Sequence, residues 1–221
     1  MKQLDKKIVF KIAADGSSAS GKTTGSKLIA KKFKMNFLSS GTLYRYCALK
    51  ILNNKNIYDQ KFINKISKKI TLKKLKNQKL YSPEVAKLSS IIAKKPFVRK
   101  SLKKFQKDFI KKSRLVIVEG RDIGTKIMVF ADLKIFFKCS IKEKAKRRFE
   151  EFKKLNNRIT LKEVKKALIQ RDKEDTKRKI SPLIKSKNSV LVDTTKLTKK
   201  QMEAKLINLV RRSISKKYGD I

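Results

Sequence analysis

The sequence has no histidine and only two cysteines among its 221 residues. Without histidine, the chain has no histidine general base, no Ser-His-Asp triad and no histidine-ligated metal centre. The two cysteines, Cys47 and Cys139, provide neither a zinc quartet nor a disulfide framework, so we expect both to be buried, reduced thiols of a cytoplasmic protein. Glycine and proline are also scarce, with 7 and 3 residues, which argues against a disordered or collagen-like chain.

Long apolar segments are missing as well. The first apolar run, Ile8–Ala14, is interrupted by Lys11 and is too short to span a membrane or to act as an export signal. We therefore expect a cytoplasmic monomer that does not enter a membrane. The length and a hydrophobic fraction of 40% predict a single folded domain over residues 1–221, which carries at most an insert.

Acidic residues are far fewer than basic ones. Asp and Glu total 18 and Lys and Arg total 61, which gives a net charge of +43. Such an excess ordinarily indicates a nucleic acid or an anionic membrane surface as partner. The lysines are scattered through every segment, however, as the codon bias of an A+T-rich genome would leave them, so we expect only non-specific nucleic-acid binding. The 11 arginines are more informative, because guanidinium binds phosphate in a bidentate way that lysine cannot reproduce.

Short apolar runs alternate along the chain with amphipathic helical patterns. The expected strands span residues 8–14, 36–39, 115–118, 134–137 and 189–192. The alternation predicts an α/β fold with a five-stranded parallel sheet and helices on both of its faces. Two stretches depart from this alternation of strands and helices. Residues 53–81 form a polar, lysine-rich insert, and residues 156–182 form a long, charged helical segment between the fourth and fifth expected strands.

The sharpest motif is Gly-Ser-Ser-Ala-Ser-Gly-Lys-Thr at residues 16–23, which matches G-x-x-x-x-G-K-[ST]. It follows the first expected strand and opens the first expected helix, as a P-loop does. In such a loop, backbone N–H groups face phosphate oxygens at a helix N-terminus. Lys22 would reach the β- and γ-phosphates of ATP, and the Thr23 hydroxyl would ligate Mg²⁺. The motif predicts nucleotide binding by Gly16, Ser17, Ser18, Ala19, Ser20, Gly21, Lys22, Thr23 and Thr24.

Arginines follow two further expected strands. Arg45 comes soon after residues 36–39, and Arg121 lies in the sequence Glu-Gly-Arg-Asp at 119–122. Because the carboxyl ends of parallel strands meet in one crevice, we expect Arg45 and Arg121 to face the same ligand as the P-loop.

A third group of charged residues has the spacing that places side chains on one face of a helix. Arg171, Asp175 and Arg178 recur at i, i+4 and i+7. These side chains would belong to a mobile lid that brings cations over the phosphates. Alternatively, they form an exposed ladder of salt bridges.

Together these stretches resemble the bacterial cytidylate kinases, which act on CMP and dCMP. The matching stretches follow the family order over nearly the whole chain: residues 12–23, 39–45, 82–86, 98–99, 118–125, 171–178, 181–183 and 192–195. The sequence G-R-D-I-G-T together with R-D-x-x-D-x-x-R behind a P-loop is specific, where a P-loop alone is not. The resemblance implies a nucleoside monophosphate kinase-like P-loop fold. In it, residues 53–81 would be a reduced monophosphate-binding insert, and residues 156–182 a helical lid.

The resemblance also implies an activity and a set of residues for it. The γ-phosphoryl group of ATP would pass to CMP or dCMP with Mg²⁺ as cofactor. Residues similar to the family's catalytic set are Lys22, Arg121, Arg171 and Arg178. Residues similar to its substrate-binding set are Ser40, Arg45, Ser90, Arg99, Arg121, Asp122, Arg171, Asp175 and Arg178. Of these, Ser90, Arg99 and Asp122 resemble the readers of the cytosine ring. Arg45, Arg121 and Arg178 resemble phosphate ligands, and Arg171 and Asp175 the pair near the ribose.

The sequence departs from the family in three places. Ser17 stands where relatives usually carry proline, and Ser39 where they often carry an acid. The insert at 53–81 is shorter than the usual monophosphate-binding insert of the family, which resembles a small β-sheet in relatives. The loss of strands from this insert is expected to loosen closure of the protein around the monophosphate. Two alternatives stay open, namely another small-molecule P-loop kinase and a basic RNA-associated NTPase.

Overall fold

The computed structural model describes residues 7–55, 58–153 and 159–219. The chain divides into two compact units, one made of residues 1–38 with 114–221 and the other of residues 39–113. The expected insert at 53–81 lies inside the second unit, which extends beyond it at both ends. Residues 56–57 of that insert and residues 156–158 of the expected lid lie outside the described residues.

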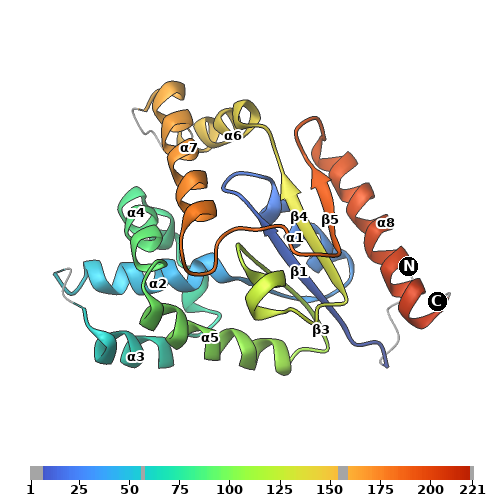
Figure 1. The fold of residues 1–221 in the computed structure, drawn as a ribbon, viewed down its shortest axis with the longest axis horizontal. Helices are drawn as coiled ribbons and strands as arrows, with labels where there is room; N and C mark the ends of the chain where they lie inside the picture. The colour runs from blue at the N-terminus through green and yellow to red at the C-terminus, as the bar shows by residue number, and fades with distance from the viewer. Residues whose placement is uncertain (1–6, 56–57, 154–158, 220–221) are drawn as a thin grey trace. The chain divides into compact units, whose positions relative to one another are not determined.

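The first unit contains a five-stranded sheet in the order β2-β3-β1-β4-β5 (Figure 1). Its strands are β1 (Phe10–Gly16), β2 (Asn36–Ser39), β3 (Leu115–Gly120), β4 (Leu133–Lys138) and β5 (Ser189–Asp193). Strand β1 pairs in parallel with β3 and with β4, and β4 pairs in parallel with β5. The predicted five-stranded α/β fold is confirmed. The order places the loops that follow β1 and β3 side by side at the carboxyl edge of the sheet.

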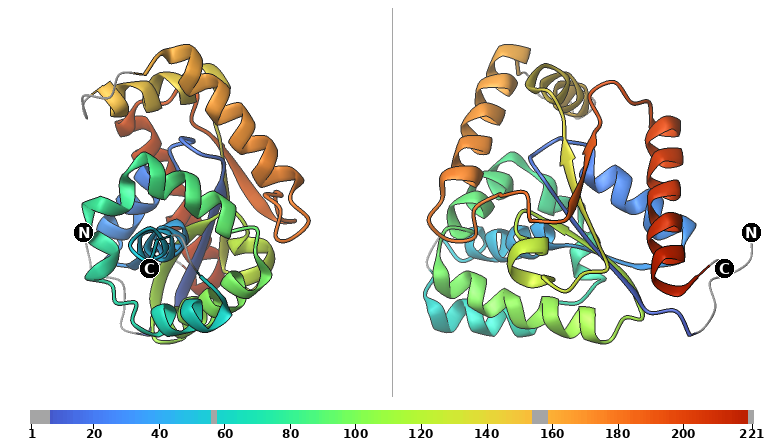
Figure 2. Two further views of the ribbon diagram at one scale, coloured as in Figure 1. Left: turned by 90° about the vertical axis from the view of Figure 1, so that its left-hand side faces the viewer. Right: turned by 45° about the vertical axis from the view of Figure 1, so that its right-hand side comes forward.

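Helices of the first unit pack around this sheet. They are α1 (Lys22–Lys32), α6 (Ile141–Lys153), α7 (Leu161–Lys177), α8 (Lys199–Tyr218) and the short π-helix Ile123–Ile127. Figures 1 and 2 show α1 on one side of the sheet and the π-helix on the other. Helix α1 packs on α8 through Gly25, where an added Cβ would lie 2.8 Å from Leu206. Helices α6 and α7 pack on each other beyond the carboxyl ends of the strands.

Two strands differ from the sequence prediction. Strand β1 spans Phe10–Gly16 and not the expected residues 8–14. It starts two residues later and continues through Asp15 and Gly16, because Asp15 pairs with Gly120 of β3 and Gly16 with β4. In β5, Val190 and Leu191 are 39% and 45% exposed. The prediction that apolar runs are covered on both faces is therefore wrong for β5, which lies at the edge of the sheet.

Beyond Ser39, the last residue of β2, the described residues of the second unit form helices joined by turns and no strand. Its helices are α2 (Ser40–Leu52), α3 (Gln60–Lys68), α4 (Pro83–Ile92) and α5 (Pro96–Lys111), with single 3-10 turns at Lys74–Lys76 and Gln78–Tyr81. Helix α2 packs on α4, and α3 packs on α5. The weak alternation at residues 70–72 forms no strand in the described chain. Ser82 accepts from the Val85 N–H at 3.3 Å and starts α4, with Pro83 as its first residue.

Both cysteines are free and buried, as predicted. Burial raises the pKa of Cys47 to about 12, so this thiol stays protonated at neutral pH. Among the described helices, none combines the length and the apolar character that crossing a membrane requires.

Candidate active site

The loop between β1 and α1 has the backbone of an anion-binding loop. Gly16 has φ +157°, and an added Cβ there would lie 2.6 Å from the carbonyl oxygen of Phe137, so only glycine fits. Gly21 has φ +79° and precedes α1 without a side-chain cap, and the first turn of α1 carries no acidic residue. The first N–H groups of α1 are therefore not bonded by a capping side chain and face an incoming anion.

Lys22 and Thr23 both contact the carboxylate of Glu119 at the end of β3. The Lys22 Nζ lies 3.3 Å from Glu119 Oε2, and Thr23 Oγ1 donates to Glu119 Oε1 at 2.9 Å. Burial lowers the pKa of Lys22, the charge of Glu119 opposes this, and the charge of Arg121 lowers the pKa further. Lys22 is thus a buried cation whose charged form an added phosphate would stabilise.

The oxygen atoms beside Thr23 fit a magnesium ion that arrives with a nucleotide. Magnesium binds hard oxygen donors and usually takes only one or two from the protein, with phosphates and water supplying the rest. The Thr23 hydroxyl and the Glu119 carboxylate are such donors on adjacent segments. Across the described residues, no group of three or more acidic or cysteine side chains forms a separate metal cage.

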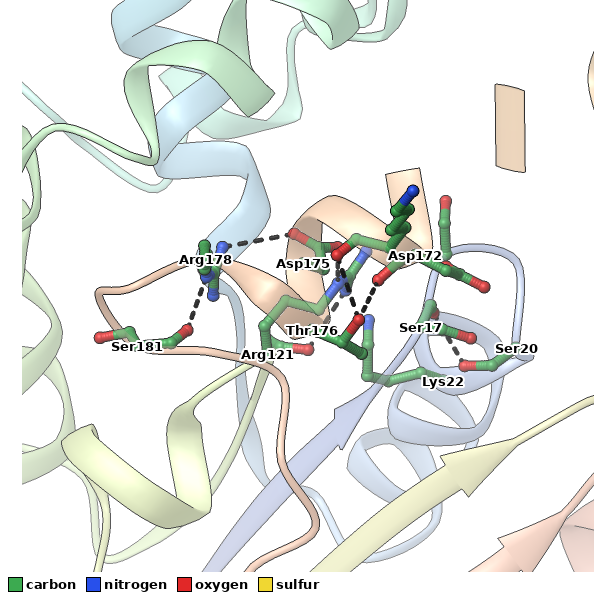
Figure 3. Close-up of polar contacts among 12 residues, drawn as sticks. Ser17, Ser20, Lys22, Arg121, Asp172, Asp175, Thr176, Arg178 and Ser181 are labelled. Carbon is green, nitrogen blue, oxygen red and sulfur yellow. Dashed lines mark hydrogen bonds and ion pairs between the residues drawn. The ribbon is translucent and has the colours of Figure 1, made fainter. Parts of the chain in front are cut away.

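Asp175 of α7 joins two arginines (Figure 3). The Arg121 Nε donates to Asp175 Oδ2 at 2.7 Å, and the Arg178 Nη1 donates to Asp175 Oδ1 at 3.3 Å. Burial alone would raise the pKa of Asp175, but the charges of Arg121, Arg178 and Arg171 lower it. Burial likewise works to lower the pKa of Arg121, yet the charge of Asp175 outweighs it and the pKa is raised. Asp175 and Arg121 are therefore both ionised in the folded protein.

Arg171 and Asp175 lie on one helix, as predicted, whereas Arg178 lies just beyond the end of that helix. Helix α7 starts at the capping box of Thr160 and Glu163 and ends at Lys177, so Arg178 is its C-cap residue. There its Nε donates to the Ser181 carbonyl at 2.6 Å (Figure 3). The alternative of an exposed ladder does not hold for Asp175, because its side chain is only 15% exposed and contacts Arg121 from the β3 loop.

Helix α6 carries cations that the sequence prediction missed. Lys144 is buried, donates to Ser17 Oγ at 3.1 Å and forms an ion pair with Asp172 of α7. The Arg148 Nη2 donates to Ser18 Oγ at 3.3 Å. Ser17 therefore gives the P-loop a hydroxyl contact with α6.

Arg147 ties α6 to the segment after β5. Its Nη1 and Nη2 donate to the hydroxyl and carbonyl oxygens of Thr194 at 3.1 and 2.8 Å, and the Thr194 hydroxyl donates to the Ser20 carbonyl at 2.9 Å. The sequence signal was available, since two of the rare arginines stand together at 147 and 148.

Asp15, at the carboxyl end of β1, was also missed. Its Oδ1 accepts from the Ile123 N–H at 2.9 Å and its Oδ2 from the Gly124 N–H at 2.7 Å. Burial raises the pKa of Asp15 to about 6; these two N–H groups oppose the rise, the charge of Asp122 adds to it, and Lys22 opposes it. Asp122 itself is 6% exposed and stands at the start of the π-helix Ile123–Ile127.

Replacing Asp15 with asparagine is expected to change how stability depends on pH. The pKa of Asp15 is about 6 in the folded protein against an ordinary value of 3.8, so the unfolded chain ionises first and folding stability falls as the pH rises through this interval. Asparagine does not titrate. The unfolding free energy of the native protein minus that of the variant should therefore drop by about 2.5 kcal/mol from pH about 4 to about 7. Urea unfolding across that range measures the difference, and a constant difference would contradict the raised pKa.

The remaining predicted residues lie in the second unit. Arg45 of α2 donates from Nη1 to the Leu80 carbonyl at 2.9 Å and stacks over the Tyr81 ring at 5.1 Å. Arg99 of α5 donates to the Ala93 carbonyl at 3.0 Å and stacks over the Tyr44 ring at 5.5 Å. These contacts hold both guanidinium groups against aromatic rings inside the unit.

Two predicted serines belong to the same unit. Ser40 is buried in the first turn of α2, and Ser90 is half-buried on α4. Helix α2 packs against both α4 and α5. Whether the residues of this unit bind the same ligand as the P-loop stays a prediction.

A family model and curated relatives of this chain all carry the same description. The family model described as Cytidylate kinase matches residues 12–212. A cytidylate kinase of Fervidobacterium nodosum is 36% identical over 211 residues, covering 91% of this chain and 96% of that protein. A cytidylate kinase of Pseudothermotoga lettingae is 37% identical over 196 residues, covering 84% and 87%.

A solved structure shares the fold at low sequence identity. It is an uncharacterized protein from Eubacterium ventriosum, with a TM-score of 0.52 and 13% identity over 91% of this chain and 98% of that one. This likeness concerns the arrangement of helices and strands alone.

Proposed function

Because this chain belongs to the cytidylate kinase family, we propose that it transfers the γ-phosphoryl group of ATP to CMP or dCMP, giving ADP and CDP or dCDP. The observation that carries this proposal is the charge cluster at the carboxyl edge of the sheet. There Lys22 of the P-loop contacts Glu119, and Arg121 contacts Asp175. The cations of the donor-binding loop and of the G-R-D segment thus belong to one buried electrostatic network.

The reaction needs no protein nucleophile and no histidine base. The attacking oxygen belongs to the phosphate of CMP and is already anionic at neutral pH. Catalysis is then the positioning of two phosphate groups and the neutralisation of charge between them. We assign this neutralisation to Lys22, Arg121, Arg171 and Arg178. A bound Mg²⁺, held by Thr23 with Glu119 beside it, would supply further positive charge at the β- and γ-phosphates.

The carboxylates of the cluster act as counterions for these cations. Glu119 neutralises Lys22, and Asp175 neutralises Arg121 and Arg178. Phosphate oxygens of the two substrates would take over contacts with the same cations when they bind. The arginines and the lysine are held in place before the substrates arrive, which reduces the cost of ordering them during the reaction.

The substrate contacts carried over from the family are proposed as follows. Arg45 binds the phosphate of CMP together with Ser40, and Arg171 and Asp175 lie near the ribose. Ser90, Arg99 and Asp122 read the cytosine ring. The burial of Asp122 supports this last role, because a buried carboxylate discriminates sharply between a hydrogen-bond donor and an acceptor.

Several broader features are proposed with this function. The region 53–81 serves as the reduced monophosphate-binding insert and the region 156–182 as a lid that moves over the nucleotides. Helix α7 and the Arg178 cap form the described core of that lid. The enzyme works as a cytoplasmic monomer.

The test is a coupled ADP-release assay with CMP, dCMP, UMP, AMP and shikimate as acceptors. We expect the highest kcat/KM with CMP or dCMP. A preference for shikimate or AMP would favour another small-molecule P-loop kinase and contradict the proposal. ADP release that needs no acceptor and rises with RNA would favour the RNA-associated NTPase.

Binding to RNA is expected to be weak and without sequence preference. The net charge of +43 attracts any polyanion, and such binding depends on the release of counterions. The affinity should therefore fall by orders of magnitude between about 50 and 200 mM salt. Fluorescence anisotropy with two unrelated RNA sequences measures this. Tight binding that survives the higher salt and distinguishes the sequences would contradict it.

A further inference from the structure

Asp15 connects two segments that the proposed reaction uses separately. It is the last residue before the P-loop glycine Gly16, yet its carboxylate is bonded to the backbone that follows Arg121 and Asp122. Its two oxygens accept from two consecutive N–H groups, of Ile123 and Gly124, at 2.9 and 2.7 Å. The residue is 5% exposed, so water does not compete for these bonds.

The two N–H groups belong to the start of a π-helix. The π-helix Ile123–Ile127 opens with Asp122 as its N-cap residue, and the side chain of Asp122 makes no capping hydrogen bond. The initial N–H groups of any helix need an outside acceptor. Asp15 provides that acceptor from β1.

We propose that Asp15 is a positioning residue that fixes the Arg121–Asp122 segment in the orientation that receives the monophosphate substrate. The inference rests on the proposed function, since it assigns the acceptor side of that reaction to this segment. Arg121 follows Gly120, whose backbone pairs with Asp15 in the sheet. The segment between that sheet pairing and the two carboxylate bonds consists only of Arg121 and Asp122, so its backbone is anchored at both ends.

Asparagine at position 15 would break this arrangement with little change in size. An ionised carboxylate accepts through both oxygens, whereas the asparagine amide accepts through one and donates from the other side. Its NH₂ group would face one of the two backbone N–H groups, which would be left without an acceptor. The Arg121–Asp122 segment would then move, while the P-loop motif keeps all of its residues.

Asp132, just before β4, offers a matched control at the opposite end of β1. Its Oδ2 accepts from the Lys11 N–H of β1 at 2.7 Å, and its Oδ1 pairs with Lys217 of α8 at 2.6 Å. Like Asp15→Asn, Asp132→Asn therefore removes a carboxylate that accepts from a backbone N–H, here that of Lys11 in β1. It lies at the end of β1 away from the P-loop, so it should leave the KM values for both substrates unchanged.

The experiment compares the native enzyme, Asp15→Asn and Asp132→Asn in steady-state kinetics with CMP and ATP varied separately. We expect Asp15→Asn to raise the KM for CMP about tenfold, the loss that one unsatisfied hydrogen bond typically causes. The KM for ATP should change less than about twofold. Equal rises in both KM values, or the same effect in Asp132→Asn, would overturn the inference.

A measurement on the native protein covers the case in which Asp15→Asn does not fold. Amide hydrogen exchange followed by NMR should show Ile123 and Gly124 strongly protected in the nucleotide-free enzyme. Exchange of both amides at the rate of an open loop would overturn the inference. A native enzyme that is inactive on CMP would instead contradict the proposed function, so the two failures are distinguishable.

Discussion

Replacing Lys22 with alanine is expected to lower kcat for phosphoryl transfer by at least about 100- to 1000-fold. The ammonium group would contact the phosphoryl group whose charge changes most in the transition state, so its loss raises the barrier directly. The fold should persist, because burial already lowers the pKa of Lys22 and its charged form is costly where it lies. The coupled ADP-release assay measures kcat, and circular dichroism with thermal unfolding checks the fold.

Lys27→Ala is the matched control for this experiment. Lys27 lies on the same helix, α1, but its side chain is exposed. Its replacement removes one positive charge from the same region of the protein and should leave kcat within about twofold of the native value, as surface substitutions usually do. A Lys22→Ala enzyme with near-native kcat would remove the basis for the P-loop assignment.

Asp122→Asn is expected to reduce the preference for CMP over UMP by about 10- to 100-fold, mainly through lower activity toward CMP. Cytosine presents an amino group at C4 and an acceptor at N3, whereas uracil presents a carbonyl at C4 and an N–H at N3. In the proposed role, the carboxylate of Asp122 would accept from the cytosine amino group but would repel the uracil carbonyl. The asparagine amide both accepts and donates, so it tolerates either base.

Discrimination is measured as the ratio of kcat/KM for CMP to kcat/KM for UMP in the native and variant enzymes. The ratio separates base reading from a general loss of activity, because a disturbed fold lowers both rates together. An unchanged ratio in Asp122→Asn would show that Asp122 does not read the base, even in an active cytidylate kinase.

The parts of the site that lie next to one another in sequence were predictable. The P-loop needs glycine at Gly16 and Gly21 for its backbone angles, and such requirements are visible as sequence spacing. The link between Asp175 and Arg121 was partly predictable, since Arg121 was expected at the sheet's carboxyl edge and Asp175 in a lid over the phosphates bound there. Their direct contact depends on how α7 packs, which no spacing specifies.

The parts that the sequence did not reveal depend on contacts between distant segments. The apolar pattern places Asp15 just after the first strand, whereas in the structure its carboxylate binds the N–H groups of Ile123 and Gly124, more than 100 residues away. Lys144 is one of many lysines, and only the folded chain distinguishes it as buried between Ser17 and Asp172. The exposure of β5 likewise follows from its edge position and not from its composition.

The central claim is that the γ-phosphoryl group of ATP passes directly to CMP at the P-loop. Incubation of the enzyme with CMP and ATP labelled with ³²P at the γ position tests it, with the products separated by thin-layer chromatography. The account predicts that the label appears in CDP in proportion to the ADP formed and that little inorganic phosphate is released. Label recovered mainly as inorganic phosphate, with CMP unchanged, would contradict it.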